Sequence, residues 1–312
     1  MHRSRERFER ENARLPRNED RGDGAWYSHK PLRRREPWPP VLARLASWAL
    51  LPVYVAQGLW IRDRVRRMPP AEGPREGRLG GRDDERAEVR LLVIGDSTAA
   101  SVGIADAGQG LAAQLARLVH HETGRSVLWR ASGHNSAIAE EVRDHVVPHI
   151  APRDWTHVVI LIGTNDTKNW HSVGRWKKGF GTLLYALNAR FPRARLYWSE
   201  AVDPRDVPGL PAPLAQIMRL RRDLINAKGQ ELCFERGCTA VRPIPDVMPA
   251  GFCIDGFHAS EEGYRHWART IGDYVVADLR GDRAPRPSPR LATGSETSGE
   301  TMGDEERMQA AE

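Results

Sequence analysis

Leu91-Leu92-Val93-Ile94-Gly95-Asp96-Ser97 is the stretch that decides the fold. Four apolar residues followed by glycine and short polar residues are typical of a strand that is buried on both faces and ends in a tight turn. A serine hydroxyl at the tip of such a strand becomes a nucleophile when a neighbouring base removes its proton. Near the other end of the chain, Asp255-Gly256-Phe257-His258 offers an imidazole and a carboxylate for that task.

Predicted strands and helices alternate outward from this stretch. The strands are predicted at residues 91–94, 127–131, 157–162, 196–198 and 239–242, and the helices at 111–123, 137–147, around 183–187, 214–234 and 264–279. Such alternation indicates βαβ units and a parallel sheet covered by helices on both faces. Ligands bind beyond the carboxyl ends of the strands in these sheets. Ser97, Gly133 and Asn165 each follow a predicted strand, so we expect them to meet at one edge.

Two of these residues are candidate donors to the oxyanion, the negatively charged oxygen of a tetrahedral intermediate. The side-chain amide of Asn165, in Gly163-Thr164-Asn165-Asp166, can donate to it, and an Asx turn is the structural alternative. Gly133 allows the main chain to approach a ligand closely, so its N–H can donate, and a plain turn glycine is the alternative. Asp166 is expected to bond the backbone amides of its own loop.

Asp255 and His258 are candidates for the acid and the base of the same site. They lie three residues apart, just before a helix that is predicted to begin at Ser260. A short loop can hold the carboxylate against one ring nitrogen while the other nitrogen faces Ser97. The alternative for His258 is a surface histidine, since the chain contains eleven. A turn or helix-capping serine is the alternative for Ser97.

The stretches that contain Ser97, Gly133, Asn165 and His258 together resemble the four blocks of the SGNH (GDSL-like) hydrolases, over residues 90–278. The resemblance implies an α/β fold of three layers, α/β/α, with a flavodoxin-like parallel sheet. It implies Ser97 as the nucleophile, His258 as the base and Asp255 as its orienting acid. It also implies an oxyanion hole formed by the Ser97 and Gly133 amides and the Asn165 side chain, and no metal or organic cofactor.

These expectations describe a serine-dependent ester hydrolase, esterase-like or lipase-like, that acts on small-molecule or lipid acyl esters through an acyl-enzyme. A carbohydrate O-acetylesterase or acyltransferase is an alternative, and so is a membrane-tethered binding protein without turnover. Thr98 stands where many SGNH members have Leu or Ile, which bears on the substrate. Trp170 and Trp176, which follow the Asn165 loop, are predicted to line an acyl pocket, with a place in the core or on the surface as the alternative.

Residues 41–61 form an apolar segment about long enough to cross a bilayer core. Arg44, Pro52 and Gln57 argue against a simple spanning helix, whereas the aromatic residues in the segment favour a membrane interface. We expect a spanning or in-plane membrane anchor, with the catalytic domain cytoplasmic. A helix packed on a soluble cytoplasmic protein and kinked at Pro52 is the alternative, followed by a retained signal-like segment.

Composition divides the chain into a disordered charged tail at 1–40, an apolar helix at 41–68, a linker at 69–88, a hydrolase domain at 89–280 and a disordered tail at 281–312. The net charge of +6 comes largely from arginines before residue 90 and favours an anionic membrane surface as partner. Nucleic acid is not expected, because no stacking platform or zinc-finger spacing accompanies the charge.

The three cysteines are expected to be reduced thiols that bind no metal. A disulfide bridge between Cys233 and Cys238 is left open as an alternative.

Overall fold

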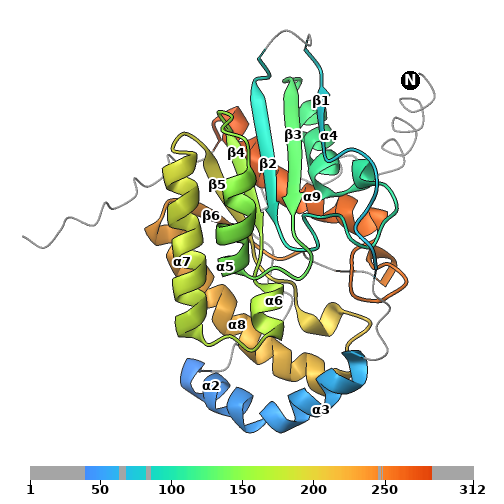
Figure 1. Cartoon of the computed structure of the whole chain (residues 1–312), viewed down its shortest axis with the longest axis vertical. Helices are drawn as coiled ribbons and strands as arrows, with labels where there is room; N and C mark the ends of the chain where they lie inside the picture. The colour runs from blue at the N-terminus through green and yellow to red at the C-terminus, as the bar shows by residue number, and fades with distance from the viewer. Residues whose placement is uncertain (1–38, 63–67, 82–85, 245–246, 248, 283–312) are drawn as a thin grey trace, which may run out of the picture. The chain divides into compact units, whose positions relative to one another are not determined.

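The computed structural model describes residues 39–62, 68–81, 86–244, 247 and 249–282 (Figure 1). Within them lies a sheet of six strands in the order β1-β3-β2-β4-β5-β6. The strands are β1 (Glu76–Leu79), β2 (Val89–Gly95), β3 (Val127–Gly133), β4 (His157–Leu161), β5 (Arg195–Ser199) and β6 (Cys238–Val241). Strands β2 to β6 pair in parallel, which confirms the predicted parallel sheet.

Strand order identifies the place where a ligand can bind. Without the edge strand β1, the parallel strands run second, first, third, fourth, fifth, which is the flavodoxin-like order. The chain leaves β2 toward β3 on one side and later returns to β4 on the other. In sheets of this kind ligands bind at such a reversal, beyond the carboxyl ends of the strands. Here those are the ends of β2 and β4, where the sequence places Ser97 and Asn165.

Helices cover both faces of the sheet, which confirms three layers (Figure 1). Leu92 and Ile94 of β2 face one hydrophobic cluster, while Leu91 and Val93 face the other, because successive side chains of a strand point to opposite sides. The first cluster is completed by helices α7 (Val173–Arg190) and α8 (Ala212–Glu235). The second is completed by α4 (Leu111–Thr123) and α9 (Glu261–Arg280).

Some local predictions were wrong. The single helix predicted at 137–147 is a short helix α5 (Ala139–Glu141) that continues as a π-type turn over Val142–Val146 and a 3₁₀ turn over Val147–His149. Helix α6 (Thr164–Lys168) was not predicted. Strand β1 lies inside the predicted linker and pairs antiparallel with β3, from Glu76 opposite Arg130 to Leu79 opposite Val127. Its pairing covers the edge of β3 that would otherwise present unpaired backbone groups.

The apolar N-terminal segment is two helices rather than the single predicted helix. Helix α2 (Pro40–Ala49) and helix α3 (Leu51–Arg62) meet at an angle of 58°. Pro52, in the first turn of α3, has no N–H to continue the hydrogen bonding of α2. No described helix is by itself long and apolar enough to cross a membrane, and only the bent pair taken together reaches that length and composition. The tails predicted to be disordered lie almost entirely outside the described residues.

Candidate active site

Ser97 lies in a tight series of turns directly after β2. The turns are closed by hydrogen bonds from the Ala100 N–H to the Asp96 carbonyl (3.1 Å) and from the Val102 N–H to the Ser97 carbonyl (3.0 Å). Gly95, the last residue of β2, has φ +151°, and a side chain there would collide with the Leu161 carbonyl of β4. Glycine is therefore required where the chain turns out of the sheet, and this turn leaves Ser97 half-buried.

Gly133, the last residue of β3, packs directly against the Ser97 turn. A Cβ atom at this position would lie 2.6 Å from the Asp96 carbonyl oxygen and would also collide with the main chain of Ala99 and Ala100. The following residue, His134, donates its N–H to the Gly95 carbonyl at 3.0 Å. The structure thus brings Gly133 to Ser97, and the close approach excludes any larger residue.

Asn165 lies in the first turn of α6 and is buried. Its Nδ2 donates to the Ala137 carbonyl at 3.1 Å and makes a longer contact of 3.4 Å with Oδ2 of Asp96, the neighbour of Ser97. An amide nitrogen has two hydrogens. The Ala137 bond holds the side chain in place, and the long contact to Asp96 leaves the second hydrogen available to a stronger acceptor.

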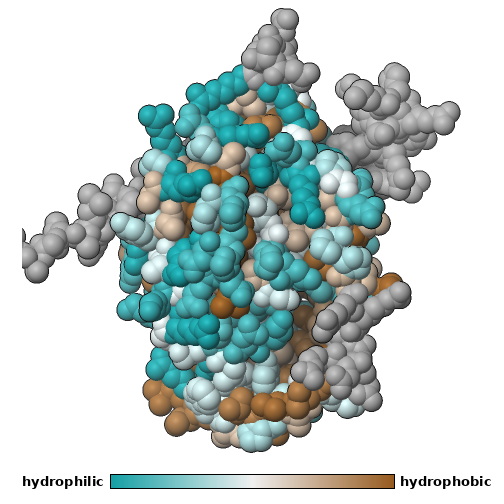
Figure 2. All heavy atoms as spheres, in the orientation of Figure 1, coloured by the Kyte–Doolittle hydropathy of each residue, from teal (hydrophilic) through white to brown (hydrophobic). Residues whose placement is uncertain are grey.

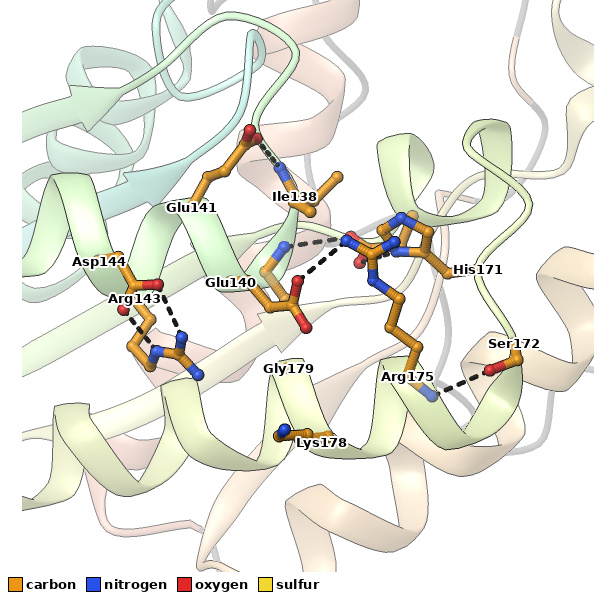
Figure 3. A network of polar contacts seen from close by, with 12 residues as sticks. Ile138, Glu140, Glu141, Arg143, Asp144, His171, Ser172, Arg175, Lys178 and Gly179 are labelled. Atoms are coloured by element: carbon orange, nitrogen blue, oxygen red, sulfur yellow. Dashed lines mark hydrogen bonds and ion pairs between the residues drawn. The ribbon is translucent and has the colours of Figure 1, made fainter.

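Buried polar contacts hold the Asn165 loop in place. Asp166 accepts from the Ala139 N–H at 3.3 Å and lies 3.1 Å from Nδ1 of His171, and both its side chain and that of His171 are almost fully buried. Figure 3 shows the surrounding network, in which Glu140 of α5 bonds Arg175 of α7 at 3.1 Å. Asp166 is therefore structural, but its side chain bonds the N–H at the start of α5 rather than amides of its own loop, and it ties α6 to α5.

Asp255 and His258 form a tight pair on the loop before α9. Oδ2 of Asp255 lies 2.6 Å from Nδ1 of His258, while Oδ1 accepts from the N–H groups of Phe257 (2.7 Å) and His258 (2.9 Å). Burial opposes ionisation of this carboxyl, but the hydrogen bonds from His258 and Phe257 hold its pKa below the usual range. An ionised carboxylate only accepts, so Nδ1 carries the proton and Nε2 is left with its lone pair free.

The loop that carries His258 packs on the turns that carry Ser97. A Cβ atom at Gly103 would lie 2.6 Å from the Ala259 carbonyl oxygen and 2.8 Å from Cβ of His258. The hydroxyl of Tyr264 in α9 fixes the same contact by donating to the Val102 carbonyl at 2.7 Å. Among the described residues, no hydrogen bond joins Ser97 to His258. Catalytic hydrogen bonds are often long in a free enzyme and shorten when substrate binds.

Two residues of the site were not assigned a role from the sequence. Burial raises the pKa of Asp96 to about 6, against hydrogen bonds from Thr98 and the charge of nearby His258. Cys253 donates its thiol to Oδ1 of Asp255 at 3.1 Å. The only signal for either residue was its position within or beside a recognised block.

A cavity of about 10 Å³, which is room for one water molecule, lies beside Asp96 and Thr98 at the ends of β4 and β5.

The two tryptophans predicted to line an acyl pocket have different surroundings. Trp176 is fully buried in the core, stacked on Phe180 with ring centroids 4.6 Å apart and packed against Trp198. It does not line an acyl pocket, because the apolar surface between α7 and the sheet encloses it. Trp170 packs against Tyr54 of α3, with centroids 4.3 Å apart, so a helix of the N-terminal pair contacts it.

Comparisons with known proteins find one matching family and several similar solved structures. The GDSL-like Lipase/Acylhydrolase family matches residues 93–266. Among solved structures, a carbohydrate acetylesterase from Sinorhizobium meliloti is 16% identical with a TM-score of 0.46, the match covering 61% of this chain and 99% of that one. A lipase/acylhydrolase from Enterococcus faecalis is also 16% identical, with a TM-score of 0.44 and coverage of 64% and 100%.

A comparison with curated proteins gave no match. The family match spans more than half of the chain and includes the Ser97 turn, Gly133, Asn165 and the Asp255–His258 loop. The chain therefore belongs to the GDSL-like lipase/acylhydrolase family.

Proposed function

We propose that this protein hydrolyses carboxylic esters through an acyl-enzyme, with Ser97 as the nucleophile. The observation that carries the proposal is the Asp255–His258 pair, held at 2.6 Å on a loop that packs against the Ser97 turn. A carboxylate that fixes the Nδ1–H tautomer of an imidazole prepares the other ring nitrogen to act as a base. A surface histidine has no need of such a buried partner.

In the first half of the reaction, Nε2 of His258 takes the proton of the Ser97 hydroxyl as Oγ attacks the ester carbonyl carbon. The carbonyl π bond breaks and its electron pair becomes the oxyanion of a tetrahedral intermediate. The intermediate collapses when the ester C–O bond breaks, and the imidazolium gives its proton to the departing alkoxide. The products of this half are a free alcohol and an acyl group on Ser97.

In the second half, water repeats the attack. Nε2 of His258 takes a proton from the water, the hydroxide adds to the acyl carbon, and the second intermediate releases the carboxylic acid. The proton returns to Oγ of Ser97, which restores the starting enzyme. Asp255 stabilises the imidazolium in both halves and stays ionised, consistent with its lowered pKa.

We assign three donors to the oxyanion. They are the N–H of Ser97, the N–H of Gly133 and the Nδ2 group of Asn165. The contacts of Gly133 with the Ser97 turn and of Asn165 with Asp96 support this assignment, because both residues lie against the nucleophile turn. Donors fixed before the reaction stabilise the developing charge without any cost of reorganisation.

To identify which esters the protein accepts, turnover is measured with p-nitrophenyl acetate, butyrate and decanoate, and with an acetylated sugar. We expect Ser97→Ala to abolish turnover of every ester that the wild type accepts. Ser172→Ala is the matched control, because Ser172 caps α7 and belongs to no part of the proposed site. Unchanged turnover in Ser97→Ala would remove Ser97 from the mechanism. A wild type that turns over none of these esters would favour a binding protein that has kept the fold.

A further inference from the structure

A row of exposed apolar side chains runs along α2 and α3. Figure 2 shows it as a brown band over these two helices, in contrast to the mainly hydrophilic surface around α7. The side chains in the row are between 48% and 66% exposed and include Val41, Leu45, Trp48, Val55 and Leu59. Contiguous apolar surface of this kind marks a site of interaction with a protein or a membrane.

The opposite side of the helix pair is already attached to the folded domain. Ala43 of α2 is buried against Leu220 and Leu224 of α8. Trp170 lies between the two helices and the domain, 4.3 Å from the ring of Tyr54 and 6.5 Å from that of Trp48. The guanidinium of Arg221 in α8 lies 5.0 Å from the Trp170 ring. The pair is therefore a fixed part of the domain with one face covered and one face open.

Length and bend favour an element that lies flat on a membrane. Helices of 10 and 12 residues are about 15 and 18 Å long, whereas the hydrocarbon core of a bilayer is about 30 Å thick. To span it, the pair would have to straighten its 58° bend and give up the contacts with Trp170 and α8. Lying in the plane of the interface requires neither change.

The charge of the sequence that contains and flanks α2 and α3 points to the chemistry of the partner of this row. Between residues 30 and 67 the sequence has two acidic residues, Glu36 and Asp63, against nine basic ones: Lys30, Arg33, Arg34, Arg35, Arg44, Arg62, Arg64, Arg66 and Arg67. Basic residues that flank an apolar, Trp-containing face complement anionic headgroups above an acyl-chain layer.

We propose that α2 and α3 dock the folded protein in the plane of an anionic lipid membrane. The exposed row enters the acyl boundary, and the arginines meet the headgroups. The hydroxyl of Tyr54 donates to the carbonyl of Lys168, which ends the helix that begins beside Asn165. The docking element thus contacts the segment that carries a candidate oxyanion donor. Docking itself does not depend on ester hydrolysis.

The test uses the full chain and preformed sealed vesicles, made either of phosphatidylcholine alone or with phosphatidylglycerol added. We expect flotation with the anionic vesicles and release when salt is raised to about 1 M, where charges are screened within about 3 Å. The double variant Leu45→Ser, Val55→Ser should bind the anionic vesicles more weakly than the wild type, by about ten-fold or more for each apolar side chain removed. The matched control is Tyr185→Ser, Phe234→Ser, whose side chains are even more exposed but lie on α7 and α8. It should partition like the wild type.

Orientation is read from tags placed at both ends of the chain. In-plane docking leaves both tags open to protease added outside the vesicles. Protection of one tag would show a spanning segment and overturn the proposal. So would a failure of the wild type to float with anionic vesicles, or an equal loss of binding in the control variant. Self-association that depends on Leu45 and Val55, without vesicle binding, would assign the row to a second copy of the chain.

Discussion

Replacing Asp255 with Asn tests the hydrogen-bond geometry of the proposed base. Oδ1 of Asp255 accepts two backbone N–H groups, at 2.7 and 2.9 Å. An Asn carbonyl can accept the same two bonds, which leaves the Asn NH₂ group pointing at Nδ1 of His258. A donor in that place requires Nδ1 to be the acceptor, so the imidazole proton moves to Nε2. In the proposed mechanism, the ring nitrogen that would accept the Ser97 proton then carries a proton of its own and can no longer remove it.

Imposing the wrong tautomer in a catalytic triad lowers kcat by about 10⁴-fold, which corresponds to about 5.4 kcal/mol of transition-state stabilisation. We expect a loss of this size in kcat for p-nitrophenyl acetate, with little change in thermal unfolding, because the backbone bonds survive. Since Asn and Asp have nearly the same shape, the loss is chemical in origin. A variant that retains kcat within about ten-fold of wild type would refute the role given to the pair.

Three further perturbations probe other parts of the site and core. Asn165→Ala removes one oxyanion donor and should lower kcat by about 10²–10³-fold, measured with the same ester, and an unchanged kcat would contradict the donor role. Burial raises the pKa of Asp96 from 3.8 to about 6 in the folded protein, so ionisation destabilises the fold as the pH rises through this range. Asp96→Asn should therefore gain stability relative to wild type between pH 4 and pH 7 in urea unfolding, and a constant difference would contradict the raised pKa. Trp176→Ala should lower the free energy of unfolding by about 3–5 kcal/mol, whereas a selective loss of long-chain ester turnover in a stable variant would restore its role in substrate binding.

The sequence predicted the sheet because the sheet depends on local signals. Leu91–Ile94 is apolar at every position, and such a run suits only a strand that is covered on both faces. Ser97, Gly133 and Asn165 lie at or just beyond the carboxyl ends of three neighbouring parallel strands, so they share one edge of the sheet. The contacts of Gly133 and Asn165 with the turn around Ser97 follow from this topology.

Other features depend on contacts that a single sequence does not display. Strand β1 has no apolar alternation, and pairing with β3 makes it a strand. Helix α6 is only five residues long, too short for a periodic pattern. Trp176 follows the Asn165 loop in sequence, but the helical turn places its side chain against Trp198 in the core. Tertiary packing decides each of these cases.

Labelling with a fluorophosphonate probe tests the central proposal most directly, because the probe forms a covalent bond only with an activated serine. We predict that mass spectrometry of digested wild type finds one phosphonylated peptide, modified at Ser97, and that His258→Ala removes the label while the protein remains folded. Label on another serine, or equal labelling of Ser97 in His258→Ala, would contradict the assignment of Ser97 and His258 as nucleophile and base.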